Sequence, residues 1–146
     1  MSKKQAPLIF FIDHCVSQKI VPAAMRAAGA TVEAHLEHFP INAPDTEWLP
    51  EVSRRGWVVI TKDWGLTSNL LEQRAIAAAK AQVFILSSGN YTGEEMAAIL
   101  VKSLERLQKF VRGNQAPFIA RINASGQVRM HQNKSKLLKL IKGRDS

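Results

Sequence analysis

Two aspartates stand directly at the ends of short apolar runs in the first half of the chain. One run, residues 8–12, leads into Asp13, and another, residues 57–62, leads into Asp63. Ligands of open α/β sheets collect beyond the carboxyl ends of parallel strands, so both carboxylates are expected at one pocket. Like charges repel strongly in a partly dry pocket unless a cation lies between them, so the pair predicts a site for a hard metal ion such as Mg²⁺.

Three more acidic side chains lie where predicted helices begin. Asp45 and Glu47 fall in the first turn of a helix predicted over residues 45–56, and Glu72 falls near the start of another over residues 70–81. Acidic residues at these positions also suit the helix dipole, and Asp45 can be an N-cap, so structural roles explain them as well. Either Asp45 or Glu47 is a candidate third ligand, with Asp45 favoured, and Glu72 is a candidate fourth.

The elements that must position these acids alternate along the chain. Segments typical of buried strands are residues 8–12, 31–36, 57–62 and 82–86, and helical segments are residues 19–28, 45–56, 70–81 and 92–111. Strands separated by helices predict a parallel sheet with right-handed crossovers. Residues 118–122 and 128–130 flank a turn and predict a C-terminal β-hairpin that closes one edge of the sheet.

Length and composition indicate one compact domain. A chain of 146 residues with 46% hydrophobic residues can bury roughly two-thirds of its unfolded surface in a single core. The single cysteine, Cys15, excludes an internal disulfide and a redox pair, which fits a reducing cytoplasm. The first apolar run ends on a charge and is too short for a signal peptide or a membrane span.

Positive charge is concentrated in the last third of the chain. Residues 1–101 hold nine Lys and Arg against ten Asp and Glu, whereas residues 102–146 hold eleven against two. This asymmetry indicates a polyanionic partner, and the lack of Trp or Phe in the tail argues against a membrane. The candidate phosphate contacts here are Arg121, Arg129, Lys134, Lys136 and Lys139. Apolar residues 137, 138, 140 and 141, between these lysines, predict docking on the domain itself or on a partner.

The order of motifs along the chain carries a family resemblance. These motifs are an apolar strand before Asp13, a loop with Pro44-Asp45 and Glu47-Trp48, the phrase Arg55-Gly56-Trp57-Val58-Val59-Ile60-Thr61-Lys62-Asp63, and then Asn69 and Glu72. With them the chain resembles the PIN-like branch of the PIN-domain nucleases, which includes relatives of the VapC-type toxins. The resemblance covers residues 8 to about 122.

The resemblance implies a fold and an activity. The expected fold is a three-layer α/β/α sandwich with a mainly parallel sheet, in which residues 1–122 form the nuclease domain. Residues 123–146 would supply the hairpin end and a short basic tail. The implied activity is cleavage of single-stranded RNA with one or two Mg²⁺ or Mn²⁺ ions held by acidic side chains.

Individual roles carry over only where this sequence matches the family pattern. Asp13, Asp45 and Asp63 match catalytic acids that also bind metal, and Glu47 and Glu72 are further candidate metal ligands. Many relatives place another Asp two residues after the second strand-end acid, where this chain has glycine. That departure favours one tightly held ion over two.

The resemblance also implies protein partners. VapC-type proteins are usually held inactive by a cognate antitoxin, so such an antitoxin is an expected partner, with a homodimer as a further option. No membrane association is expected, and the expected location is the cytoplasm.

Three residues beside the strand-end acids are candidate nucleic-acid contacts. His14 could donate to a phosphate or orient a metal-bound water, and Lys62 could reach the scissile phosphate or simply face outward from its strand. Trp64, in the turn after Asp63, is a candidate for stacking on a base.

Other protein classes fit the sequence less well. A phosphoacceptor receiver domain needs paired acids after the first strand, and a haloacid-dehalogenase phosphatase needs Asp-x-Asp there, but this chain has Asp13-His14-Cys15. The alternative that stays open is an RNA-binding or protein-interaction module that keeps the fold without the chemistry.

Overall fold

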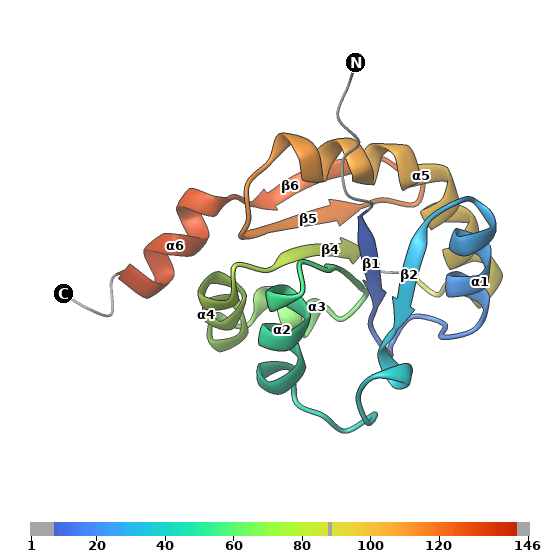
Figure 1. The fold of residues 1–146 in the computed structure, drawn as a ribbon. Coiled ribbons are helices and arrows are strands. Elements are labelled where there is room, and N and C mark those ends of the chain that lie inside the picture. Colours follow the sequence, from blue (N-terminus) through green and yellow to red (C-terminus); the bar gives the residue numbers. More distant parts are fainter. Residues whose placement is uncertain (1–7, 88, 143–146) are drawn as a thin grey trace, which may run out of the picture.

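The computed structural model describes residues 8–87 and 89–142, and a six-stranded sheet lies at its centre (Figure 1). The strands are β1 (Ile9–Ile12), β2 (Thr31–Ala34), β3 (Val58–Thr61), β4 (Gln82–Leu86), β5 (Phe118–Ile122) and β6 (Val128–Gln132). They lie in the order β2-β1-β3-β4-β5-β6, and every neighbouring pair is parallel except β5 and β6. The mainly parallel sheet and the C-terminal hairpin confirm the predicted α/β class.

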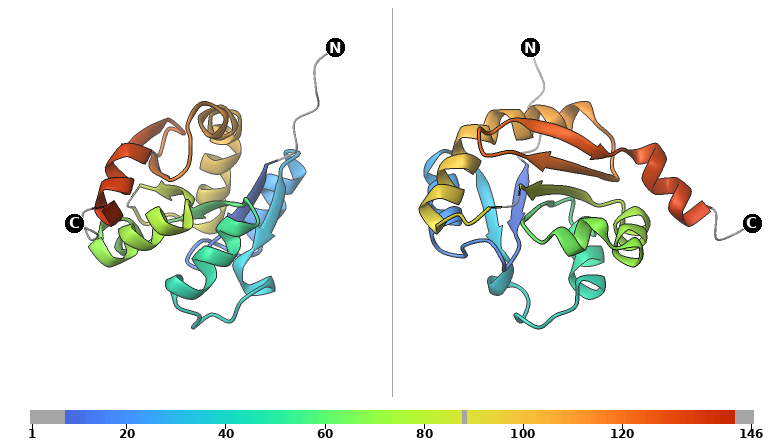
Figure 2. Two further views of the ribbon diagram at one scale, coloured as in Figure 1. Left: turned by 60° about the vertical axis from the view of Figure 1, so that its left-hand side comes forward. Right: turned by 180° about the vertical axis from the view of Figure 1, so that it is seen from behind.

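Helices cover both faces of this sheet, which gives the predicted three layers (Figures 1 and 2). On one face, α1 (Ile20–Ala27) and α5 (Gly93–Gly113) enclose a core that includes Phe10. On the other face, α2 (Asp45–Arg54), α4 (Leu70–Ala79) and α6 (Lys134–Lys142) enclose a core that includes Phe11. Successive strand residues thus enter opposite cores, as expected for strands buried on both faces.

The chain changes direction across the sheet between β1 and β3. It steps outward from β1 to β2, crosses back over β1 to β3, and then continues through β4 to β5. The crevice beyond the carboxyl ends of strands at such a switch point is the usual ligand site of an open α/β sheet. Asp13 follows β1 and Asp63 follows β3, so both predicted strand-end acids lie at this position.

One crossover differs in hand from the others. The step from β1 to β2 runs in one direction with α1 on one face, and the steps from β2 to β3 and from β3 to β4 run in the other direction with α2 and α4 on the other face. Because direction and face both reverse, these three crossovers share one hand. The step β4 to β5 runs in the same direction as β3 to β4, yet α5 lies on the opposite face from α4. The prediction that all crossovers are right-handed is therefore wrong for this chain. The apolar side of α5 packs against α1, which holds α5 on that face.

One further segment differs from the sequence-based expectation, and another takes one of its two predicted forms. The strand predicted over 31–36 ends at Ala34, because the chain turns into the short helix η1 (His35–Glu37) and buries the His35 ring. The basic tail contains α6, which contacts α4 and inserts Leu137 into the core between them. Leu137, Leu140 and Ile141 therefore dock on the domain itself, which is one of the two predicted options. Within the described ranges, no helix is both long and apolar enough to span a membrane.

Candidate active site

Asp13 is a buried carboxylate at the carboxyl end of β1, with 2% of its surface exposed. Its amide donates to the Ile60 carbonyl of β3 at 3.0 Å, which fixes the backbone. Its Oδ2 accepts a 2.8 Å hydrogen bond from Thr61 Oγ1, and its Oδ1 accepts one of 2.8 Å from the His14 amide. Burial acts to raise the pKa of Asp13, but the nearby His35 ring, the hydrogen bond from Thr61 and the charge of His14 bring the pKa below its usual value.

Thr61 connects Asp13 with the second strand-end acid. Its buried hydroxyl donates to Asp13 and accepts a 3.0 Å hydrogen bond from the Asp63 amide. The Asp63 carboxylate lies at the N-cap of the short helix α3 (Trp64–Ser68), where it accepts from the Gly65 amide at 2.9 Å. Asp63 therefore caps a helix, and as an exposed residue it also presents its carboxylate to solvent.

Asp45 and Glu72 meet where α2 and α4 begin. A side-chain hydrogen bond to Asp45, burial, and the negative charges of Asp45 and Asp63 raise the pKa of Glu72 to about 8. Glu72 is therefore mostly protonated at neutral pH and shares its proton with Asp45. Glu47 lies exposed on the first turn of α2, so Asp45 is the member of that pair of candidates that meets another acid.

The predicted acids fall into two groups. Asp45 and Asp63 both act to raise the pKa of Glu72, whereas Asp13 groups with His14 and His35. In the second group, one ligand atom from each residue lies within 4.8 Å of the others. Among the residues that the structure describes, no three carboxylates approach one another that closely.

His35 belongs to this site although it was not among the predicted site residues. Its side chain is fully buried against the rings of Phe11 and Trp48, and its Nδ1 lies 3.2 Å from Asp13 Oδ1. His14 Nδ1 lies 3.1 Å from the same oxygen, and its side chain is 35% exposed. One carboxylate oxygen with two imidazole nitrogens can hold a divalent ion of the first transition series. The signal in the sequence that could have identified His35 was its position directly after β2, at the edge of the sheet that carries Asp13.

Cys15 and Lys62 border Asp13 without adding a reactive group. Burial and the charge of Asp13 raise the pKa of the Cys15 thiol to about 11, so it is not a thiolate nucleophile at neutral pH. The Lys62 amide donates to Cys15 Sγ at 3.4 Å, which ties the end of β3 to the turn after β1. The Lys62 side chain is half-buried.

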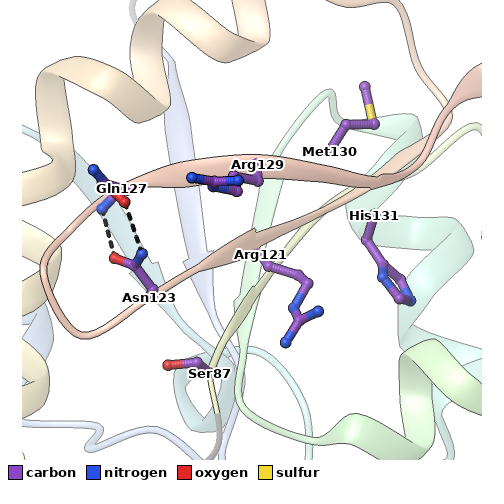
Figure 3. A pocket seen from close by; sticks show the side chains of 7 residues that line it. All are labelled: Ser87, Arg121, Asn123, Gln127, Arg129, Met130 and His131. Atoms are coloured by element: carbon purple, nitrogen blue, oxygen red, sulfur yellow. Dashed lines mark hydrogen bonds between the residues drawn. The ribbon is translucent and has the colours of Figure 1, made fainter.

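Trp64 joins the acidic region to the C-terminal hairpin. The guanidinium carbon of Arg121 lies 4.9 Å from the centre of its ring. The His131 ring meets it edge-on, with ring centres 6.2 Å apart. Arg121 and His131 also line a hollow of about 340 Å³ with Ser87, Asn123, Gln127, Arg129 and Met130 (Figure 3). Trp64 is thus half-buried, and one of its faces carries Arg121.

The predicted basic contacts of the tail are spread over α6. Lys136 lies close enough to His131 for its positive charge to lower the pKa of that imidazole, after burial and Arg121. Lys134 Nζ donates to Gln115 Oε1 at 2.8 Å, which directs it toward the segment after α5. Lys139 is exposed in the last turn of α6. Arg121 and Arg129 are therefore the two predicted contacts that line the hollow.

Comparison with known proteins gives a family and a relative. Residues 8–88 match the family model described as "PIN like domain". A protein of Mycobacterium tuberculosis (strain ATCC 25618 / H37Rv), named "Putative ribonuclease VapC45", is 26% identical over 124 residues. This alignment covers 82% of the present chain and 89% of the relative. No solved structure matches the chain.

Proposed function

Because the chain belongs to the PIN-like domain family, we propose that it is a metal-dependent endoribonuclease acting on single-stranded RNA. The relative that is named as a ribonuclease supports this activity, since the alignment covers most of both chains. The location of Asp13 and Asp63 at the switch point of the sheet supports a hydrolytic site there.

The observation that carries the proposal is the crowding of Asp45, Glu72 and Asp63. Together with burial, it raises the pKa of Glu72 to about 8. The carboxyl groups of Asp45 and Glu72, which share a hydrogen bond, need a proton or a cation between them, and the charge of Asp63 adds to this need. A divalent cation that displaces the shared proton would offset the charge of all three groups at once.

The donor set of this group fits Mg²⁺ or Mn²⁺. Carboxylate oxygens are the ligands that these hard ions prefer, and Asp45, Glu72 and Asp63 supply them. Asp13 is linked to Asp63 through the hydroxyl of Thr61 and would add a fourth carboxylate at this edge of the sheet. When bound, the ion lowers the pKa of a coordinated water and offsets negative charge on the phosphodiester. Glu47 lies exposed on the same helical turn as Asp45 and is not needed as a ligand under this proposal.

The residues around the acids have separate tasks under this proposal. Thr61 and His35 keep Asp13 ionised and oriented. His14 is partly exposed and could donate to a phosphate oxygen of the substrate. Lys62 adds a positive charge beside Asp63 and would support substrate binding.

The relation to VapC-type proteins extends the proposal to partners. We propose that the protein acts as the toxin of a toxin-antitoxin pair in the cytoplasm, and that a cognate antitoxin inhibits it by covering the acidic region. The M. tuberculosis relative motivates this extension. A homodimer is the simplest assembly of such a toxin.

A binding module without catalysis is the second candidate. The observation that favours it is the separation of Asp13 from the other acids, because no three described carboxylates form a compact ligand set. Gly65, in place of a further acid, points in the same direction.

Cleavage of labelled single-stranded RNA by the full chain distinguishes these candidates. We expect cleavage with Mg²⁺ or Mn²⁺ and none with EDTA. Asp45→Asn and the double variant Asp13→Asn, Asp63→Asn should lower the rate by at least about 100-fold. Glu94→Gln, on an exposed residue at the start of α5, is the matched control and should cleave like the wild type. Equal RNA binding with and without metal, and no cleavage by the wild type, would support the binding module instead.

A further inference from the structure

Two arginines face each other across the C-terminal hairpin. In the antiparallel pairing of β5 with β6, Arg121 lies directly opposite Arg129. Like charges in directly opposed positions destabilise a sheet. The pair therefore works against the fold unless something negative lies between or beside the two side chains.

No described acidic side chain neutralises this pair. The ion pairs formed by residues 8–87 and 89–142 include neither Arg121 nor Arg129. The local field is positive, because Arg121 and Lys136 both act, after burial, to lower the pKa of His131. The hairpin thus holds a cluster of cationic groups that lacks an anionic partner within the described part of the fold.

The surrounding residues hold this cluster in place around a hollow. The Arg121 guanidinium packs on the ring of Trp64, with its central carbon 4.9 Å from the ring centre. A bulge between Ile119 and Ala120 leaves His131 without a partner on β5, and its side chain lines the hollow. At the closed end, the Asn123 amide donates to Gln127 Oε1 at 3.1 Å across the turn (Figure 3). A hollow of about 340 Å³ has room for a phosphate group and part of a nucleoside.

We propose that the Arg121–Arg129 pair binds a phosphate of the RNA strand, a few nucleotides from the bond that is cut. The proposal rests on the proposed function, because RNA is the polyanion that function requires. Guanidinium groups suit phosphate, since each presents several N–H donors in one plane. All lining residues except Ser87 lie beyond residue 88, outside the part of the chain that matches the PIN-like family model.

The hollow lies on a continuous path from the acidic region. Asp63 caps α3, Trp64 is the first residue of that helix, and Arg121 rests on Trp64. Ser87 follows β4 and Asn123 follows β5, so the hollow occupies the same carboxyl edge of the sheet as Asp13 and Asp63. A strand held at the arginine pair would therefore be directed along this edge toward the acids, and Trp64 acts as a positioning residue for Arg121.

Binding of a fluorescent single-stranded RNA to the full chain, measured in EDTA so that no cleavage occurs, tests the proposal. Arg129→Gln is the main variant, because Arg129 is exposed and its change leaves the contact between Trp64 and Arg121 intact. We expect affinity to fall roughly tenfold at moderate salt and the slope of log affinity against log salt to decrease by about 0.7. Arg121→Gln should act alike, and the double variant should decrease the slope by about 1.4.

The thermal midpoint separates a binding role from a structural one. Relief of the repulsion should leave the Tm of Arg129→Gln unchanged or raise it by about one to a few degrees, while RNA affinity falls. Arg112→Gln, an equal charge change at an exposed position in the last turn of α5, is the matched control and should retain the wild-type affinity and slope. Loss of affinity together with a lower Tm, or equal loss in the control, would overturn the proposal.

Two results distinguish this proposal from the proposed function. If the wild type cleaves RNA while the arginine variants bind it normally, the phosphate site is wrong and the nuclease assignment stands. If the arginine variants lose RNA binding but no metal elicits cleavage by the wild type, the phosphate site stands and the nuclease assignment fails. A pair that serves an acidic protein segment instead would leave RNA binding unchanged in both variants, which also overturns the proposal.

Discussion

The hydroxyl of Thr61 donates a 2.8 Å hydrogen bond to Oδ2 of Asp13, and both side chains are buried at the carboxyl edge of the sheet. Thr61 Oγ1 in turn accepts a 3.0 Å hydrogen bond from the amide of Asp63. One neutral side chain on β3 therefore stabilises the buried carboxylate after β1 and fixes the backbone at the second acid. Together with His35 and His14, this hydroxyl holds the pKa of Asp13 below its usual value although the carboxylate is buried.

Replacement of Thr61 by valine should destabilise the protein through Asp13. The variant keeps the shape of the side chain but removes a hydrogen bond to a buried carboxylate, which is expected to lower the free energy of unfolding by about 1–3 kcal/mol. Urea denaturation at neutral pH measures the change. Thr61→Ser, which keeps the hydroxyl, is the control and should lose less; equal losses in the two variants would show that the missing methyl contacts matter and the hydroxyl does not.

Replacement of Glu72 by glutamine should change how stability depends on pH. The folded pKa of Glu72 is about 8, above its ordinary 4.5, so the folded state holds a proton that the unfolded state has released between these values. The free energy of unfolding should therefore fall as pH rises through this window. In Glu72→Gln this fall should be smaller. Urea denaturation in EDTA at a series of pH values provides the measurement.

Addition of Mg²⁺ tests whether the acids around Glu72 bind a metal ion. A divalent ion bound by Asp45, Glu72 and Asp63 must displace the shared proton, so Mg²⁺ should stabilise the wild type more at pH 8 than at pH 5. Glu47→Gln is the matched control and should keep both the pH dependence and the response to Mg²⁺. If Mg²⁺ does not change the stability of the wild type at any pH, Asp45, Glu72 and Asp63 do not form a metal site.

The positions of the strand-end acids could be predicted because local sequence determines them. A short apolar run followed by a charge marks the end of a buried strand, and parallel strands bring such ends to one edge. Asp45 and Glu47 could not be separated in this way. They lie two residues apart on one helical turn and face different directions, and only the packing of α2 against α4 brings Asp45 to Glu72.

His35 and the Arg121–Trp64 contact depend on tertiary structure that the sequence pattern does not contain. The alternation over residues 31–36 is typical of a strand, and nothing local indicates that the chain turns at His35 to bury the ring beside Asp13. Trp64 and Arg121 meet because β3, β4 and β5 are successive neighbours in the sheet. The hand of the β4–β5 crossover could not be predicted either, because it depends on the packing of α5 against α1.

Replacement of His35 by leucine should destabilise the protein more at neutral pH, where Asp13 is ionised, than in acid. His35 lies 3.2 Å from Asp13 Oδ1 and helps to hold the pKa of Asp13 below its ordinary 3.8, against the effect of burial. A carboxylate with a depressed pKa contributes stability that is present above its unfolded pKa and is lost as pH falls through the folded pKa. His35→Leu should therefore cost about 1–3 kcal/mol at pH 7, and the deficit should shrink below pH 3.8 as Asp13 becomes protonated.

His38→Leu is the matched control for this variant. His38 lies in the same segment but pairs with Glu33 at 2.6 Å, away from Asp13. The loss of this pair should lower the free energy of unfolding by only about 0–1 kcal/mol, as is typical of an ion pair near the surface. This small loss should not change as Asp13 becomes protonated. The measurement is urea denaturation of both variants across the acid range. A deficit of His35→Leu that stays constant from pH 7 to below the pKa of Asp13 would mean that the ring acts by filling space beside Phe11 and Trp48, without an electrostatic effect on the carboxylate.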